Sequence, residues 1–155
     1  MAYLRDHPID AAALLDSVGG PERGGVASFI GTVRNHHGGR RVRRLEYSAY
    51  AAMAEAECAR IVTETERRWP VKVGLLHRVG ALEIGDIAVA IAVAGDHRDE
   101  AFAACRHMIE EVKRRVPIWK RERYEDGTEL WVDPTQEAGG ARGTLDSETA
   151  AGVGG

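Results

Sequence analysis

The chain has 155 residues, a length typical of one domain with a sizeable core. Apolar residues make up 44% and charged residues 29%, as in soluble globular proteins, and no apolar run approaches the roughly 20 residues that span a membrane. The formal net charge of −3 excludes a general attraction for nucleic acid, so anion binding has to come from local clusters of basic residues.

The first half of the chain predicts a short helix, two strands and a longer helix. Asp10 is placed to cap the helix AAALLDSV, and GGVASFIGTVR (24–34) follows as a glycine-containing strand. NHHGGR is predicted as a turn or loop, and VRRLEYSAY (42–50) as a strand that turns Leu45, Tyr47 and Ala49 to one face. The next helix, 51–69, is predicted to bury the side that carries Ala52, Ala56, Ala59 and Val62.

The second half predicts two strands, a helix and a hairpin. Residues 87–95 are apolar on both faces and are therefore expected at the centre of a sheet, beside a strand at 71–80. A helix is expected to begin at Asp96, to bury Phe102, Cys105, Met108 or Ile109, and Val112, and to stop before Pro117. An Asp-Gly turn then joins strands 119–124 and 129–132. This order predicts an α+β fold.

The composition changes from Thr135 onward, where large apolar residues become rare and Gly and Ala common. We therefore expect one domain at 1–134 and a flexible tail at 135–155. The isolated cysteines, Cys58 and Cys105, argue against a disulfide framework, and the first ten residues do not resemble a secretory signal. A cytoplasmic location is expected.

The stretch VKRRVPIWKRE (112–122) is the first candidate for chemistry. Five of its residues are basic, and Pro117 separates Lys113 from Lys120. A lysine can hold an anion, or act as an acid, base or nucleophile where burial or cationic neighbours shift its pKa. The residues alone favour a solvated basic surface over such a site.

Three other stretches offer weaker signals. His97 and Arg98 open a helix, where backbone N–H groups favour an anion, and Arg34 ends a strand before a glycine-rich loop. The adjacent His36 and His37 lack further ligands at a useful spacing, so no metal site is predicted. His77 ends a strand, and packing is a better account of it than catalysis.

Five motifs in register add a resemblance. FIGTVRNHHGG, LEYSAYAAMA, HRVGALEIGD, AGDHRDEAFAAC and VKRRVPIWKRE occur in this order between residues 24 and 132. Together they resemble the large, catalytic subunit of molybdopterin synthase. The resemblance implies an α/β-hammerhead fold with a mixed sheet, no cofactor, and a homodimer at the centre of a heterotetramer.

The resemblance also implies a reaction and its residues. A small ubiquitin-like subunit would present a C-terminal thiocarboxylate, whose sulfur is transferred to cyclic pyranopterin monophosphate. The family's essential lysines fall on Lys113 and Lys120, and its substrate-binding residues on Phe29, Arg34, His97 and Arg98. We expect Lys120 to lie nearest the incoming glycine, and Lys113 to act in proton transfer or oxyanion stabilisation. Arg34, His97 and Arg98 are expected to bind the phosphate.

Helix length constrains how these residues meet. His97 and Lys113 lie sixteen positions apart on one predicted helix, which places them about 24 Å apart. One small pocket cannot receive both from the same helix. We therefore expect His97 and Arg98 to reach the site of the partner subunit.

Two other functions stay open on the residues alone. A nucleic-acid-binding module would use the basic clusters with Trp119, although only 6% of residues are aromatic. A scaffold without activity would only bind the ubiquitin-like partner, although it would not need Lys113 and Lys120. The final Gly-Gly is expected as chance in a glycine-rich tail, with insertion of the tail into a pocket as the alternative.

Overall fold

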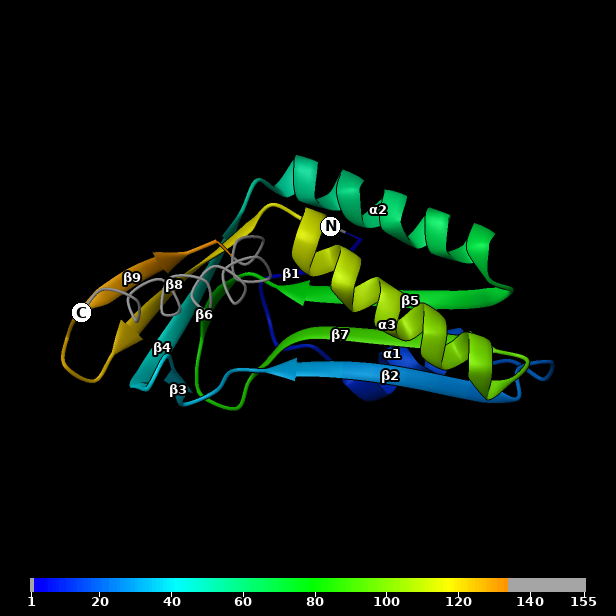
Figure 1. Ribbon diagram of the computed structural model, residues 1–155, viewed down its shortest axis with the longest axis horizontal. Coiled ribbons are helices and arrows are strands. Elements are labelled where there is room, and N and C mark those ends of the chain that lie inside the picture. Colours follow the sequence, from blue (N-terminus) through cyan, green and yellow to red (C-terminus); the bar gives the residue numbers. More distant parts are fainter. Residues whose placement is uncertain (1, 134–155) are drawn as a thin grey trace, which may run out of the picture.

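The structure is a computed structural model that describes residues 2–133, and these form two β-sheets and three helices (Figure 1). In chain order the elements are β1 (Leu4–Arg5), α1 (Ala11–Val18), β2 (Gly25–Thr32), β3 (His36–His37), β4 (Arg40–Ala49), α2 (Ala51–Arg68), β5 (Val71–Arg78), β6 (Gly80–Leu82), β7 (Ile87–Gly95), α3 (Arg98–Arg115), β8 (Ile118–Tyr124) and β9 (Glu129–Val132). The expected tail at 135–155 lies outside the described residues.

The first sheet has the strand order β1-β5-β7-β2. β1 runs parallel to β5, and the other neighbours are antiparallel, so the sheet is mixed. β7 is central, and its residues from Ala88 to Gly95 are all buried, as its apolar sequence predicts. Ile91 and Val93 face the main core, whereas Ala92 and Ala94 face α1, where small side chains let the short helix pack closely.

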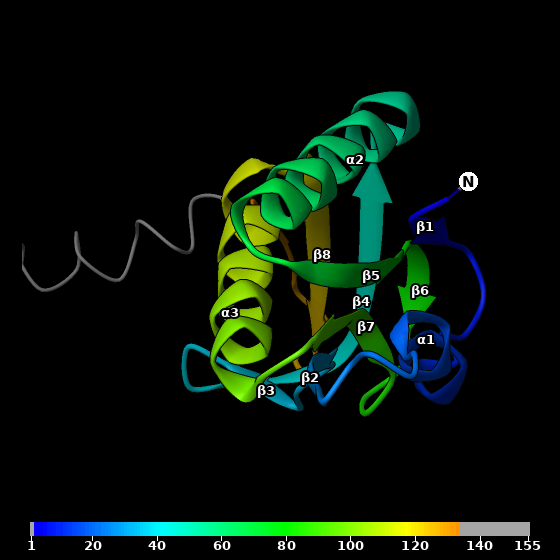
Figure 2. The same ribbon diagram turned by 90° about the vertical axis from the view of Figure 1, so that its right-hand side faces the viewer.

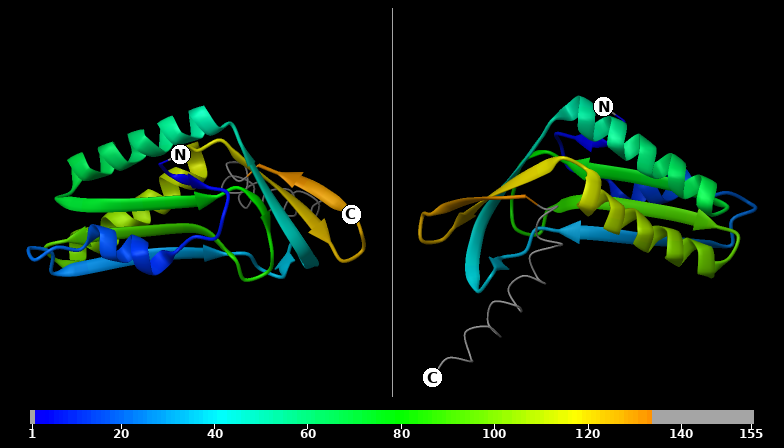
Figure 3. Two further views of the ribbon diagram at one scale, coloured as in Figure 1. Left: turned by 180° about the vertical axis from the view of Figure 1, so that it is seen from behind. Right: turned by 45° about the horizontal axis from the view of Figure 1, so that its top comes forward.

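Helices cover both faces of this sheet. α2 and α3 lie on one face, and α1 lies on the other (Figures 2 and 3). α1 begins where Asp10 accepts a hydrogen bond from the Ala13 N–H at 3.0 Å, which is the predicted cap. The three-layer arrangement explains why the central strand is apolar on both of its faces.

The second sheet stands at one end of the first and has the order β3-β4-β8-β9, with β6 also paired to β4 (Figure 1). Its β8–β9 hairpin turns at Gly127, whose φ of 85° suits glycine. Its own small core contains Val33, Val42, Leu45 and Leu82. These features confirm the predicted α+β class with a mixed sheet and a C-terminal hairpin.

The predicted buried side of α2 is wrong. The residues that α2 buries are Ala54, Cys58, Ile61 and Thr65. Alanines occur around most of the helix, so small apolar residues alone did not define its face. Thr65 also makes the buried face hard to recognise in the sequence, because it is a polar residue on that face. Its buried hydroxyl donates a hydrogen bond to the Ile61 carbonyl at 2.7 Å.

Two predictions for α3 also need correction. His97, not Asp96, is the N-cap, and its N–H donates to the Glu100 carboxylate at 2.8 Å, while Asp96 faces Arg23 at 3.5 Å. Phe102 is 67% exposed, and Ala101 and Ala104 are buried in its place. Cys105, Met108 and Val112 are buried as predicted.

Three short strands were not foreseen. β1 and β6 have two and three residues and add to sheet edges, and β3 forms from the predicted loop at 35–40 by pairing with β4. Such short runs carry no readable alternation. Their pairing follows from the longer strands beside them, and the β3 pairing joins the loop to the edge of the second sheet.

Candidate active site

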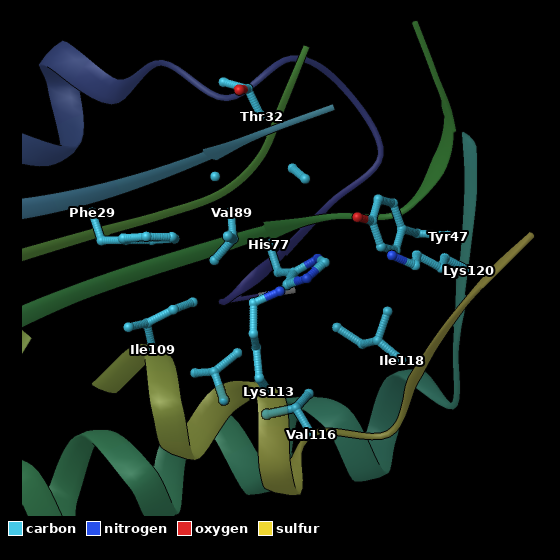
Figure 4. Close-up of a pocket in the computed structure, with 13 residues that line it drawn as sticks. Phe29, Thr32, Tyr47, His77, Val89, Ile109, Lys113, Val116, Ile118 and Lys120 are labelled. Carbon is cyan, nitrogen blue, oxygen red and sulfur yellow. The ribbon is translucent and has the colours of Figure 1, made fainter. Parts of the chain in front are cut away.

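A small pocket lies where the two sheets meet under the end of α3 (Figure 4). Its volume is about 90 Å³. It is lined by Phe29, Gly31, Thr32, Tyr47, His77, Ala88, Val89, Ile109, Val112, Lys113, Val116, Ile118 and Lys120. Most of these side chains are apolar, and no Asp or Glu occurs among them, so the amines of the two lysines face a poorly solvated space.

Pro117 explains how two lysines from one short stretch reach the same pocket. α3 ends at Arg115, where the Val116 N–H still bonds the Val112 carbonyl, and the chain turns into β8 at Ile118. Val116 and Ile118 are buried on either side of the proline and hold this turn in the core. Lys113 therefore approaches from a helix and Lys120 from a strand.

Lys120 is held by a buried carboxylate. Its Nζ lies 3.3 Å from Oε1 of Glu122, which is two residues on along β8 and thus on the same face of the strand. Glu122 is only 1% exposed. Its carboxylate also contacts Nδ1 of His37 at 2.7 Å and accepts a hydrogen bond from the Tyr124 hydroxyl.

This network keeps Glu122 ionised. Burial opposes the charge, but the hydrogen bonds from Tyr124 and His37 and the charge of Lys120 outweigh it and lower the pKa of the carboxyl below its usual value. The ammonium of Lys120 consequently has an anionic neighbour inside the protein. Its direction into the pocket is fixed by that neighbour.

Lys113 has a different neighbour. Figure 4 shows its amine directed at the ring of His77, which comes from the end of β5. His77 is buried, and its pKa is lowered to about 4, first by burial and also by the positive charge of Lys113. The imidazole is therefore neutral near pH 7. Tyr47 packs edge-on against it, with 5.2 Å between the ring centroids.

The other predicted site residues divide into two groups. Phe29 lines the pocket at the end formed by β2, together with Lys113 and Lys120. Arg34, His97 and Arg98 are exposed and do not line it. His97 and Arg98 stand at the opposite end of α3 from Lys113, as expected from the length of the helix.

Sequence reasoning missed Tyr47, His77, Glu122 and His37 as parts of the site. Glu122 could have been found, because alternate residues of a strand share a face and it follows Lys120 by two. The contact between His37 and Glu122 joins residues 85 positions apart, and no local pattern signals it. His77 was assigned to packing, which describes its burial but not its place in the pocket wall.

Most other basic residues of the region are engaged at the surface. Arg115 bonds Glu57 at 2.7 Å and Glu64 at 2.6 Å and so ties α3 to α2. Arg44 bonds Glu83 at 2.7 Å, in the manner of an exposed ion pair. Of the five basic residues in the stretch 112–122, only Lys113 and Lys120 line the pocket.

Residues 2–133 contain neither a metal-binding cluster nor a membrane-spanning helix. No group of three or more His, Cys, Asp or Glu side chains is arranged to hold a metal ion within that range. No helix in the same part of the chain is long and apolar enough to cross a membrane.

The chain is also similar in sequence to known proteins. The chain matches the family model described as MoaE protein over residues 4–115. It is 45% identical over 130 residues to the molybdopterin synthase catalytic subunit of Halalkalibacterium halodurans, which covers 83% of this chain and 83% of that relative.

Solved structures agree with the sequence match. The crystal structure of molybdopterin synthase from Staphylococcus aureus superposes with a TM-score of 0.80 at 38% identity, over 84% of this chain and 95% of that one. A complex of subunits 1 and 2 of the molybdopterin-converting factor from Helicobacter pylori 26695 matches with a TM-score of 0.68. Its identity is 19%, over 84% of this chain and 88% of that one, so this second likeness extends to the fold alone.

Proposed function

The chain belongs to the MoaE protein family, and on this premise we propose that it is the catalytic subunit of a molybdopterin synthase, an enzyme of molybdenum cofactor biosynthesis. The resemblance read from the five sequence motifs is thereby confirmed. The observation that carries the proposal is the meeting of Lys113 and Lys120, from two elements, in one small and mostly apolar pocket.

The reaction transfers sulfur from a protein thiocarboxylate to a pterin. The C-terminal glycine of a small ubiquitin-like subunit enters the pocket, and water takes the place of sulfur on its acyl carbon, so that the C–S bond breaks and a carboxylate remains. The sulfur bonds to a side-chain carbon of cyclic pyranopterin monophosphate in place of an oxygen, which leaves as water or stays on the phosphate. Two such exchanges, neither of which changes an oxidation state overall, complete the dithiolene. Both substrates are anionic, which accounts for the need for two amines in the pocket.

The two lysines take different roles. Lys120 lies nearest the incoming glycine, where its ammonium, oriented by Glu122, steers the thiocarboxylate or bonds its acyl carbon for a time. Lys113 serves proton transfer or stabilises the oxyanion as sulfur leaves. Phe29 forms the apolar wall at the β2 end of the same pocket.

Arg34, His97 and Arg98 hold the substrate phosphate. Their exposed side chains suit an anion, since arginine matches phosphate oxygens with two hydrogen bonds. Because α3 separates His97 from Lys113 by about 24 Å, His97 and Arg98 serve the pocket of a second copy in a homodimer. Each copy carries one small subunit, which gives a heterotetramer. The buried free cysteines, Cys58 and Cys105, suit a cytoplasmic location.

Reconstitution tests the proposal. The protein is mixed with thiocarboxylated small subunit and cyclic pyranopterin monophosphate, and dithiolene formation is measured. The sequence contains three lysines, so Lys72, exposed on β5, provides a matched control. Lys113→Ala and Lys120→Ala are each expected to reduce turnover by about 100-fold or more, and Lys72→Ala to leave it unchanged. An inactive wild-type mixture, or full activity in both pocket variants, contradicts the proposal.

A further inference from the structure

His77 is fixed in one tautomer by its own strand. Its Nδ1 lies 2.7 Å from the carbonyl oxygen of Arg78. A carbonyl oxygen only accepts hydrogen bonds, so Nδ1 carries the proton and donates it. In a neutral imidazole the other nitrogen, Nε2, then has a free lone pair. The backbone of β5 thus determines which atom of the ring can accept a hydrogen bond.

The surroundings of the ring favour this neutral form. Burial is the first cause that lowers the pKa of His77 to about 4, and the charge of Lys113 adds to it, although the bond to Arg78 opposes both. On the strands beside β5, the partners of His77 in register are the apolar Leu4 and Val89. The titratable or charged groups at the pocket or next to the ring are Lys113 from α3, Lys120 from β8, Tyr47 from β4 and Arg78 from β5 itself.

Lys113 and His77 are neighbours in the lining of the pocket. The amine of Lys113 is directed at the ring in Figure 4, and both side chains line the same cavity. A neutral ring with an unprotonated nitrogen can receive an N–H of the amine, whereas a protonated ring would repel it. His77 can therefore accept a hydrogen bond from Lys113 in addition to packing in the core.

We propose that His77 is the positioning residue of Lys113, whose amine donates a hydrogen bond to Nε2 of the ring and is thereby held toward the pocket. The inference rests on the proposed function and deepens it. In this role His77 acts through Lys113 and not on the reacting atoms. Misplacing a reacting group by about 1 Å costs on the order of 100-fold in rate, so an oriented amine matters more than its mere presence.

Two substitutions separate this role from a structural one. In His77→Asn the amide nitrogen takes the place of Nδ1 and keeps the bond to the Arg78 carbonyl, but nothing remains at Nε2. In His77→Gln the amide oxygen takes the place of Nε2 and still accepts from Lys113, while the bond to Arg78 is lost. His107→Asn is the matched control, because His107 packs on Trp69 with 5.2 Å between ring centroids and does not line the pocket.

The kinetic result is read in the reconstituted synthase. His77→Asn is expected to lower kcat by about 10- to 100-fold with little change in KM for the small subunit, and His77→Gln to restore most of that loss. His107→Asn is expected to match the wild type. A structural role gives the reverse order, with Asn tolerated and Gln impaired, and that order overturns the inference.

A second readout needs no synthase activity. Nitrogen-15 NMR of the intact protein reports the imidazole tautomer, and we expect His77 to be protonated at Nδ1 near pH 7. In Lys113→Met the pKa of His77 is expected to rise, because one cause that lowers it is removed. Protonation at Nε2, or an unchanged His77 titration in Lys113→Met, overturns the inference. An inactive wild-type reconstitution with the expected NMR result contradicts only the proposed function.

Discussion

Lys113 and Lys120 line the same pocket, yet the protein supports them in opposite ways. Lys120 lies 3.3 Å from the carboxylate of Glu122, an ionised group that is only 1% exposed and has contacts with His37 and Tyr124. Lys113 points at His77, a buried imidazole that stays neutral because its pKa is lowered to about 4. One amine is thus beside an anion and the other beside a neutral ring.

These different neighbours give two identical side chains chemical settings that fit the separate roles proposed for them. An adjacent carboxylate holds an ammonium group through charge and hydrogen bonding, which suits a group proposed to attract an anionic glycine terminus. A neutral acceptor orients an amine without adding a counter-charge, which suits a group that must exchange protons. The two neighbours come from different strands, so each can be altered without touching the other.

The largest expected effect comes from removing the charge of Glu122. Glu122→Gln leaves the ammonium of Lys120, whose side chain is 13% exposed, without its anion. Breaking one side of a buried pair costs about 3 to 5 kcal/mol, so the free energy of unfolding in urea is expected to fall by that amount. Turnover should fall as well, since Lys120 loses its orientation.

Glu129→Gln is the control for that substitution. Glu129 pairs with Arg121 and Arg123 of β8 at the surface, and its side chain is 38% exposed. Exposed pairs contribute less than about 1 kcal/mol. Equal losses of stability in Glu122→Gln and Glu129→Gln would show that the buried network does not hold Lys120.

The next effect concerns acid and His77. The pKa of His77 is lowered from the ordinary value of 6.5 to about 4 in the folded protein. Between pH 4 and pH 6.5 the unfolded chain therefore binds a proton at His77 more readily than the folded protein does. The stability that His77 contributes is complete above pH 6.5 and is lost as pH falls toward 4. The loss amounts to about 3 kcal/mol. Urea unfolding at a series of pH values should show this slope in the wild type and not in His77→Asn.

Glu122 gives a second window at lower pH. Its pKa is lowered from the usual 4.5 when folded, so its contribution is present above 4.5 and disappears as pH falls below that value. Glu122→Gln should remove this lower slope and leave the His77 slope intact. If either variant removed both slopes, the two lysine environments would not be independent.

The smallest expected effect is at the rim of the Glu122 network. His37→Ala removes one hydrogen-bond partner of the Glu122 carboxylate, whose contacts with Tyr124 and Lys120 remain. The free energy of unfolding should fall by about 1 to 2 kcal/mol. His36→Ala is the neighbouring control, because Nδ1 of His36 contacts the exposed side chain of Asn35 at 2.9 Å. A matching loss in both variants would place His37 outside the network.

The elements that sequence reasoning predicted well are those with a simple period. The central strand β7 is apolar on both faces, and Asp126-Gly127 sits between two alternating runs, so both were readable. The buried face of α2 was not, because its alanines offer several apolar sides and the true one contains the polar Thr65. Composition finds a helix more easily than it finds the face of that helix.

The candidate site shows the same limit. Lys113 and Lys120 could be placed together because Pro117 forces a turn between them, and the distance along α3 already separated His97 from Lys113. His77 and His37 reach the site through tertiary contacts between strands distant in the chain. Neither residue carries a local pattern that distinguishes it from a packed or exposed histidine.

We propose that one pocket receives the glycine terminus of the small subunit between both lysines. Amine-reactive labelling of the intact protein tests it directly, because peptide mass spectrometry resolves all three lysines, Lys72, Lys113 and Lys120. Saturating small subunit is expected to protect Lys113 and Lys120 together while Lys72 reacts at its original rate. A small subunit that lacks its C-terminal glycine should protect neither. Protection of only one pocket lysine, or of neither, by the full-length small subunit would contradict the account.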